Sequence, residues 1–256
     1  MNRIFETIRV REQGPVAYLQ LNRKEANNSI NGRMIDECTA ALSRLEPHIQ
    51  VVVLEGLPEV FCSGADFSQV HEQHERGDAS LDVAEDLYTL WERLSSGPYI
   101  TIAHVKGKVN AGGVGFVAAC DIVIAELEAQ FSLSEMLFGL FPACVLPFLI
   151  RRIGYQRSHY MTMSTQAISG QLAYEWGLVD AVGADSSLLL RKHLPRLTRI
   201  SKDAILQYKA YLAELQLDLS SMKSKAVRAN LMMFSNPQNR ERISRYETTG
   251  LFPWEH

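Results

Sequence analysis

Two glycine-containing segments of the chain could hold backbone amides against a reacting oxygen atom. They are residues 60–67 (VFCSGADF) and 105–115 (VKGKVNAGGVG), and each lies between a predicted strand and a predicted helix. At such a junction small side chains let a ligand approach the backbone, and the amides of the helix's first turn have no partner inside the helix. Together the two turns could form an oxyanion hole, which stabilises negative charge developing on a carbonyl oxygen. Taken singly, either segment is explained as well by glycines that permit a tight turn.

Phosphate binding by a glycine-rich loop is disfavoured. Gly113 and Gly115 do not complete a G-x-G-x-x-G pattern, and the chain has no G-x-x-x-x-G-K-[ST] segment. The turns therefore predict contact with a carbonyl oxygen better than contact with a nucleotide.

Glu135 is the carboxylate whose surroundings point to chemistry. A single glutamate is usually a solvated surface residue, but this one lies in the apolar segment 131–138 (FSLSEMLF). Burial among such neighbours would raise the pKa of the carboxyl group and suit it to act as a general base.

The elements that must position these residues follow from the spacing of apolar residues. We expect a hairpin of strands at 7–10 and 16–21, a helix from the N-cap Asn31 to Pro47, a strand at 51–54, a helix at 81–94, and strands at 100–105 and 122–124. The run 51–54 (VVVL) is typical of a strand that is covered on both faces. The alternation of strands and helices predicts an α/β fold.

From Leu188 onward the apolar spacing is helical. We therefore divide the chain into a core with the active site, residues 1–187, and a helical C-terminal region, residues 188–256. That region needs a surface to pack on, and this could be its own core or a neighbouring subunit. Met161 and Met163 are expected in the core.

Composition and charge exclude several classes of protein. The formal net charge of the 256 residues is −3, and no basic run is long enough to follow a nucleic acid. No segment has the length or apolar character of a signal peptide or a membrane span. The four cysteines lack metal-site or disulfide spacing, so we expect a reduced cytoplasmic protein without a metal.

Taken together, the motifs resemble the crotonase (enoyl-CoA hydratase/isomerase) superfamily over nearly the whole chain. The matching segments are Leu21-Asn22-Arg23, Gly64-Ala65-Asp66, 107–115, Cys120-Asp121-Ile122, 131–135 with Gly139 and Pro142, and 171–180 (QLAYEWGLVD). The resemblance implies a spiral of ββα units with a helical C-terminal region. It also implies assembly into a trimer or hexamer and no metal or redox cofactor.

For the site, the resemblance implies that the N–H groups of Ala65 and Gly112 bind a thioester carbonyl and stabilise the enolate. Asp66, Phe67 and Ser68 would then line the substrate site beside them. Hydratases of this family usually carry two glutamates, and Glu135 matches the later one. Gly115 stands where the earlier one would be, which favours chemistry with one carboxylate.

Three segments resemble more closely the dehydratases of polyketide β-branching cassettes: 108–113 (KVNAGG), 137–148 (LFGLFPACVLPF) and 250–254 (GLFPW). This implies dehydration of 3-hydroxy-3-methylglutaryl-acyl carrier protein to 3-methylglutaconyl-acyl carrier protein. The partner would be an acyl carrier protein, met by a basic rim to which Lys24, Lys106 and Lys108 could contribute. Lys108, Arg151, Arg152 or a histidine could bind the distal carboxylate of the acyl chain, and the sequence does not choose among them.

The group that protonates the leaving hydroxyl stays open. The main candidates are Asp66, His71 and Asn110; the others are His74, Tyr88, Cys144, a bound water and Glu135 itself. Most have simpler explanations: Asp66 as a helix N-cap, the histidines as part of a solvated flap, and Cys62 and Cys144 as small packing residues. Tyr88 and Trp91 are expected on the packed face of a helix.

Other functions remain open beside dehydration. Decarboxylation, isomerisation or hydration of an acyl thioester would use the same oxyanion hole, although decarboxylation does not need the base Glu135. A non-catalytic scaffold or an RNA-binding member is the alternative of another class, and the lack of a basic run disfavours RNA binding.

Overall fold

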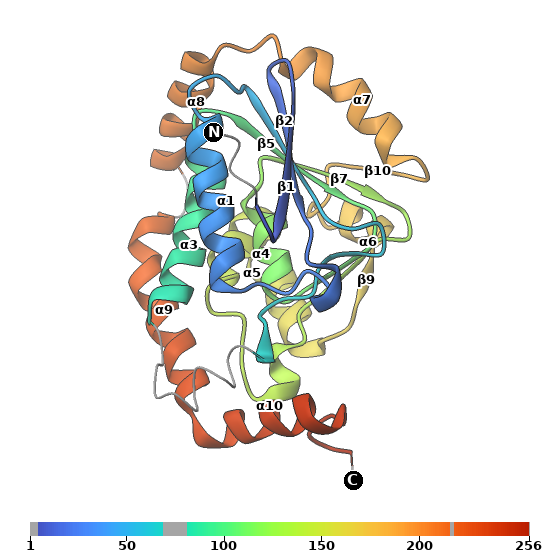
Figure 1. Ribbon diagram of the computed structural model, residues 1–256, viewed down its shortest axis with the longest axis vertical. Coiled ribbons are helices and arrows are strands. Elements are labelled where there is room, and N and C mark those ends of the chain that lie inside the picture. Colours follow the sequence, from blue (N-terminus) through green and yellow to red (C-terminus); the bar gives the residue numbers. More distant parts are fainter. Residues whose placement is uncertain (1–4, 69–80, 216–217, 256) are drawn as a thin grey trace.

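The computed structural model describes residues 5–68, 81–215 and 218–255, and its strands form two sheets (Figure 1). The six-stranded sheet has the order β1 (Ile8–Gln13), β2 (Val16–Leu21), β3 (Val51–Glu55), β5 (Ile100–Val105), β7 (Ile122–Glu126) and β10 (Ala181–Gly183). The four-stranded sheet has the order β4 (Val60–Cys62), β6 (Lys108–Asn110), β8 (Gln130–Ser132) and β9 (Ile168–Ser169).

The chain spirals because successive strands from β3 to β8 alternate between the two sheets, and helical segments follow each pair. The helical segments are α3 (Leu81–Ser96) after β4, α4 (Gly112–Ala119) after β6, and η2 (Glu135–Phe138) with α5 (Leu146–Ser164) after β8. Within each sheet the strands of successive units pair in parallel. The expected spiral of ββα units is therefore confirmed.

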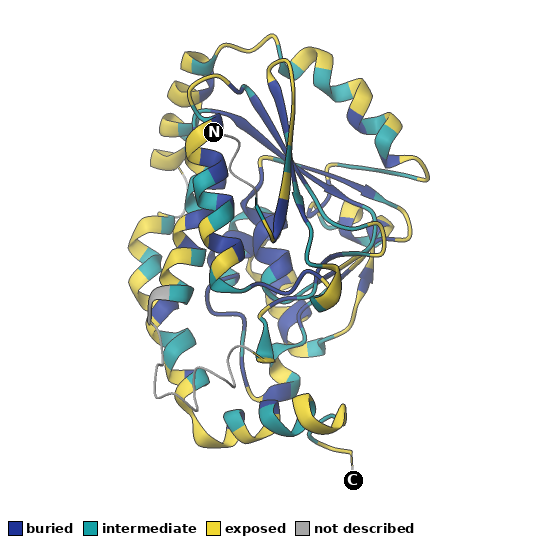
Figure 2. Cartoon of the chain, in the orientation of Figure 1, coloured by how far each residue is buried: buried dark blue, intermediate teal, exposed yellow. Residues whose placement is uncertain are grey.

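The central strands β3, β5 and β7 of the six-stranded sheet are covered on both faces, as Figure 2 shows, whereas the edge strand β1 is mostly exposed. On β3, Val52 and Leu54 belong to the main core, whereas Val51 and Val53 face a second apolar cluster with Leu190. This alternation gives the continuous apolar run that was predicted as a buried strand.

The first helix begins where the sequence predicted it. β1 and β2 pair as an antiparallel hairpin, and α1 (Gly32–Leu45) follows after the short η1 (Lys24–Ala26). The Oδ1 atom of Asn31 accepts a hydrogen bond of 2.9 Å from the amide of Met34, as an N-cap should. The predicted apolar stripe of this helix is buried.

The C-terminal helices pack on the chain's own core. They are α7 (Ser186–Leu197), α8 (Lys202–Leu215), α9 (Leu219–Ser235) and α10 (Pro237–Thr249), after the short α6 (Gly170–Glu175). α7 contacts β5, β7 and β10, α9 lies along α3, and α10 contacts η2 (Figure 1). The division of the chain at residue 188, inside α7, and a role of this region in assembly stay predictions.

One core prediction was wrong. Met161 is buried as expected, but Met163 is 59% exposed. Residues two apart on a helix point to different sides, so both cannot face the core.

Within the described residues, no helix is both long enough and apolar enough to cross a bilayer. The same part of the chain holds no group of three or more His, Cys, Asp or Glu side chains arranged for a metal ion.

Candidate active site

The turn after β4 presents the amide of Ala65. Ile30 donates a hydrogen bond of 2.7 Å to the carbonyl of Gly64, and the amide of Asp66 donates one of 3.0 Å to the carbonyl of Ile30. Peptide groups alternate in direction along an extended segment, so the N–H of Ala65 points away from Ile30. Gly64 has a φ of +98°, which a residue with a Cβ rarely adopts.

The second turn presents the amide of Gly112, the first residue of α4. Amides in the first turn of a helix have no partner inside it, and the N-cap residue Ala111 supplies no side-chain hydrogen bond. Ala111 has a φ of 51°, an unfavourable conformation of the kind found at functional sites.

These two turns lie in contact. A Cβ atom added to Gly64 would be 2.7 Å from the Cβ of Ala111 and 3.5 Å from the nitrogen of Gly112. Gly64 thus allows the close approach of two turns that are far apart in the sequence. Two adjoining turns with the amides of Ala65 and Gly112 can supply two donors to one oxygen atom, which is what an oxyanion hole requires.

Asn110 ties the oxyanion turns to the segment that carries Glu135. Its side-chain amide donates to the carbonyl of Ser63 at 3.3 Å and to the Oγ of Ser134 at 2.9 Å. Its Oδ1 accepts a hydrogen bond of 2.9 Å from the hydroxyl of Ser132. Since both ends of the amide group are engaged, Asn110 is better suited to hold the site together than to transfer a proton.

Glu135 begins η2, and its carboxylate is buried. The residue as a whole is partly exposed, but its Oε2 atom is buried and has no hydrogen-bond partner among the described residues. Burial raises the pKa of Glu135 from its ordinary 4.5 to about 7, against a smaller lowering by its own backbone N–H. The expected direction of the shift is confirmed, and a carboxyl group of this pKa can both take and return a proton near neutrality.

A cavity of about 1330 Å³ joins these features. Among the residues expected in the site, those that line it are Ala65, Asp66, Phe67, Ser68, Asn110, Gly112 and Glu135. The carboxylate and the two oxyanion turns therefore face one space that is large enough for an acyl thioester. His71 and His74 lie outside the described residues.

Sequence reasoning did not assign two walls of this cavity. One is a face of α3 formed by Val83, Ala84, Leu87 and Trp91, and the other includes Tyr246 and Phe252 from α10 and the C-terminal segment. The α3 residues recur at helical spacing, so the sequence predicts an apolar face of the helix. It does not show whether that face lines a cavity or packs on a core.

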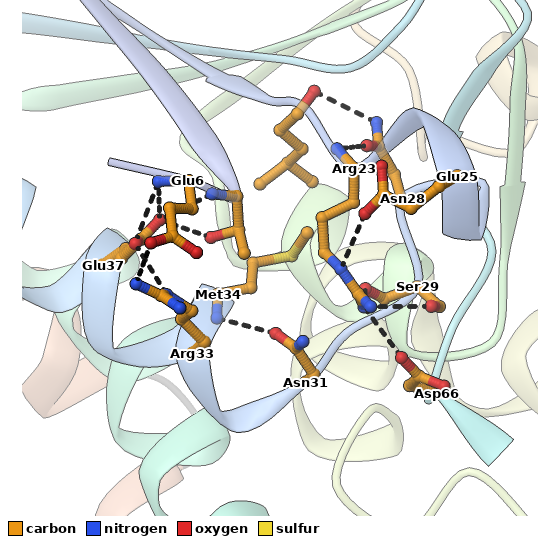
Figure 3. A network of polar contacts seen from close by, with 12 residues as sticks. Glu6, Arg23, Glu25, Asn28, Ser29, Asn31, Arg33, Met34, Glu37 and Asp66 are labelled. Atoms are coloured by element: carbon orange, nitrogen blue, oxygen red, sulfur yellow. Dashed lines mark hydrogen bonds and ion pairs between the residues drawn. The ribbon is translucent and has the colours of Figure 1, made fainter. Parts of the chain in front are cut away.

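Asp66 is held in an ion pair at the edge of the cavity (Figure 3). The guanidinium group of Arg23 donates to its Oδ2 at 2.9 Å and to the carbonyl of Ser29 at 2.7 Å. Both partners of the ion pair are largely buried. Arg23 therefore links the Asp66 carboxylate to the carbonyl of Ser29, a contact that holds the turn after β4 in place.

Phe67 and Ser68, which follow the turn after β4, contact η2 and α10 on the other side of the cavity. The ring of Phe67 meets that of Phe138 edge to face, with centroids 5.3 Å apart. The hydroxyl of Ser68 donates to a carboxylate oxygen of Glu247 on α10 at 2.6 Å. The C-terminal region therefore covers this cavity of its own chain.

The remaining proton-donor candidates have other roles. The hydroxyl of Tyr88 donates to the carbonyl of Leu219 at 2.8 Å, and burial raises the pKa of Tyr88. Cys144 lines the cavity, but burial raises the pKa of its thiol to about 12. Cys62 packs against Gly113, as a small core residue would.

Of the cations considered for the distal carboxylate, Lys108 lines the cavity and is exposed. Arg152 donates to the carbonyls of Cys120 and Leu178 and pairs with Asp180. Burial lowers the pKa of Arg151, which, like Arg152, is absent from the cavity wall as far as the structure describes it.

Trp91 occupies the space above Gly115. A Cβ atom added to Gly115 would lie 2.4 Å from the Cζ2 and Cη2 atoms of the indole ring. The ring also meets Phe116 and Phe148 edge to face, with centroids 5.8 and 5.7 Å apart. A side chain at position 115 would therefore collide with Trp91.

Comparison with known proteins relates this arrangement to enzymes. The enoyl-CoA hydratase/isomerase family model matches residues 11–256. The bacillaene synthase dehydratase PksH of Bacillus subtilis is 56% identical over 252 residues, which cover 98% of this chain and 97% of that protein. The mevalonyl-coenzyme A hydratase sidH of Aspergillus fumigatus is 34% identical over 181 residues, or 68% of this chain and 65% of that protein. A crystal structure of the B. subtilis polyketide biosynthesis enoyl-CoA hydratase pksH matches with a TM-score of 0.94 and 55% identity, covering 98% of this chain and all of that one.

Proposed function

Because the chain belongs to the enoyl-CoA hydratase/isomerase family, we propose that it is a dehydratase of acyl thioesters in a polyketide pathway. Its substrate is 3-hydroxy-3-methylglutaryl-acyl carrier protein, and its product is 3-methylglutaconyl-acyl carrier protein. The observation that carries this proposal is one buried carboxylate, with its pKa raised to about 7, in the same cavity as two turns that present backbone amides.

The reaction begins with the thioester carbonyl in the oxyanion hole. The amides of Ala65 and Gly112 donate to its oxygen, and the carboxylate of Glu135 takes the proton from C2. The electron pair left at C2 forms the C2–C3 double bond as the C3–O bond breaks. Losing one donor that is aimed at a developing oxyanion typically raises the barrier by about 3 kcal/mol.

Glu135 also returns the proton to the departing hydroxyl, which leaves as water, and the carboxylate is regenerated. A pKa near neutrality suits both steps. Asp66 is paired with Arg23, and Asn110 is fully hydrogen-bonded. Neither competes well for this role, so a single carboxylate carries the proton transfers.

Two relatives support the choice of reaction and of acyl chain. PksH is named a dehydratase, and sidH is named for mevalonyl-coenzyme A, whose acyl chain carries a hydroxyl and a methyl group on C3. The proposed 3-hydroxy-3-methylglutaryl chain has the same branching at C3.

The test is intact-protein mass spectrometry of a carrier protein loaded with 3-hydroxy-3-methylglutaryl, incubated with wild type or with Glu135→Gln. Loss of one water with wild type alone is the expected result. Loss of CO₂ from a 3-methylglutaconyl carrier, with no change in the hydroxylated one, would assign a decarboxylase instead. Equal activity of wild type and Glu135→Gln would refute the role of Glu135, and no activity in either would favour a scaffold.

We also propose that the acyl carrier protein docks at a basic rim of the cavity. Lys108 lines its wall, and Lys24 is exposed beside the lining residues Glu25 and Ala26. Because carrier proteins are acidic, Lys24→Glu with Lys108→Glu should raise KM and weaken its salt dependence. Lys192→Glu, on the exposed side of α7, is the matched control. An unchanged KM would refute this docking site.

Assembly into a trimer or hexamer is proposed as well. Exposed aromatic side chains gather on α5 and α6, where Tyr155, Tyr160 and Tyr174 are 67%, 50% and 47% exposed. Aromatic side chains such as tyrosine are enriched in protein interfaces relative to the rest of the surface. Light scattering of the purified protein would measure the assembly, and a monomer would refute it.

A further inference from the structure

Two residues that line the cavity each carry a buried polar atom without a partner in the described part of the chain. Among the described residues, the buried side-chain atoms that lack a hydrogen bond are the Oε2 of Glu135, the Nε1 of Trp91 and the Oδ1 of Asn22. The first two residues line the active-site cavity, and the third does not. Buried polar groups are nearly always paired, so an unpaired donor beside a cavity calls for a partner that the cavity can hold.

The indole is fixed in place rather than free to turn. Trp91 is only 1% exposed, and its ring is held between Phe116, Phe148 and the backbone at Gly115. A phenylalanine would fill most of this space without leaving an N–H group unpaired. An unpaired buried donor destabilises a protein, and a hydrogen bond to a bound ligand would remove that cost.

Trp91 lies beyond the oxyanion turn along α4, where the part of an acyl chain past its α-carbon could extend. Gly112 supplies the oxyanion amide, and Gly115 lies three residues further along α4, about 4.5 Å along the helix axis. Cζ2, which lies over Gly115, is separated from Nε1 by one ring atom. An acyl chain that has C1 at the oxyanion hole and runs along α4 would bring the oxygens of C3 or of its far end to this level.

We propose that Trp91 is a substrate-binding residue whose indole N–H donates a hydrogen bond to an oxygen of the acyl chain beyond C2. This inference rests on the proposed function, in which that chain carries a C3 hydroxyl and a distal carboxylate. The indole N–H adds a polar contact to the apolar wall formed by α3. This contact would select acyl chains that carry an oxygen beyond C2 over unsubstituted acyl chains.

The first experiment compares turnover by wild type, Trp91→Phe and Tyr99→Phe on the 3-hydroxy-3-methylglutaryl carrier. Trp91→Phe keeps an aromatic ring and loses the donor, so kcat/KM should fall by about tenfold, the usual worth of a hydrogen bond. Tyr99→Phe removes a buried hydroxyl that donates to the carbonyl of Arg93, away from the cavity, and should leave kcat/KM unchanged. Unchanged kcat/KM in Trp91→Phe would overturn the proposal.

The second experiment observes the N–H group directly. The chain has three tryptophans, so a ¹H–¹⁵N spectrum holds three indole signals, and the one missing in Trp91→Phe identifies Trp91. The Glu135→Gln variant is mixed with pantetheine thioesters of three acyl groups: 3-hydroxy-3-methylglutaryl, 3-hydroxy-3-methylbutyryl and 3-methylbutyryl. A hydrogen bond should move the Trp91 signal downfield with the first thioester and not with the third.

The second thioester identifies the acceptor. A downfield shift with it assigns the C3 hydroxyl, whereas a shift with the glutaryl chain alone assigns the distal carboxylate. Equal shifts with all three, or none with any, would overturn the hydrogen bond. The proposed function has a separate test, because the indole measurement does not depend on turnover. It would be refuted if wild type left the loaded carrier protein unchanged.

Discussion

Replacing Glu135 by glutamine should stabilise the folded protein at alkaline pH while abolishing its activity. Some carboxyl groups have a higher pKa in the folded protein than in the unfolded chain. Such a group favours folding most at low pH, where it is protonated in both states. That contribution is lost as the pH rises through the folded-state pKa. For Glu135 the window runs from 4.5 to about 7. Each pKa unit is worth about 1.4 kcal/mol, so the full loss amounts to about 3 kcal/mol.

Glutamine has nearly the same shape and does not ionise. Glu135→Gln should therefore exceed wild type in free energy of unfolding by up to about 3 kcal/mol at about pH 8.5, and by little at about pH 4.5. Urea denaturation at both pH values would measure this, at one protein concentration because assembly shifts stability. Glu128→Gln, in the exposed turn between β7 and β8, is the matched control for the same substitution at a site without burial. A difference equal at both pH values, or a variant less stable at alkaline pH, would refute the burial argument.

Three further outcomes are expected. The kcat/KM of wild type should rise with pH as Glu135 (pKa about 7) loses its proton, then level off; a flat profile from about pH 5.5 to 8.5 would contradict a catalytic carboxylate. Gly112→Val should lower kcat by about a hundredfold or more, because its branched side chain would block the approach of the carbonyl oxygen to the oxyanion amide as well as displacing the Cδ1 of Ile30. Gly32→Ala, whose Cβ would meet no atom within 4 Å, is its control, and equal rates would refute the oxyanion turn. Asn110→Ala should lower both kcat and, by about 1–3 kcal/mol, the free energy of unfolding, and unchanged values would exclude a positioning role.

Local signals in the sequence predicted much of this molecule. The N-cap Asn31, the buried run at 51–54 and the hairpin at 8–21 each depend on the spacing or chemistry of a few adjacent residues, and the structure contains all three. The raised pKa of Glu135 could also be predicted, because its apolar neighbours in sequence lie in the short helix η2 and the strand before it.

Contacts between distant segments could not be predicted in the same way. Asn110 joins Ser63 to Ser134, and α10 reaches the oxyanion turn through Glu247. Nothing in the sequence near Asn110 or Glu247 marks these partners, since they are set by the path of the spiral. Trp91 was expected to pack inside the protein, and it does, yet its contact with the cavity depends on where α4 passes.

The missing carboxylate at position 115 and the tryptophan at position 91 are best explained together. With any side chain at 115, the Cβ atom would lie 2.4 Å from the indole, and close packing leaves the ring no room to retreat between Phe116 and Phe148. With a small residue at 91, a glycine at 115 would leave a hole in the wall of the cavity. The two positions must therefore change as a pair. The packing of α3 on α4 thus excludes a carboxylate at position 115, which agrees with the proposal that Glu135 carries the proton transfers alone.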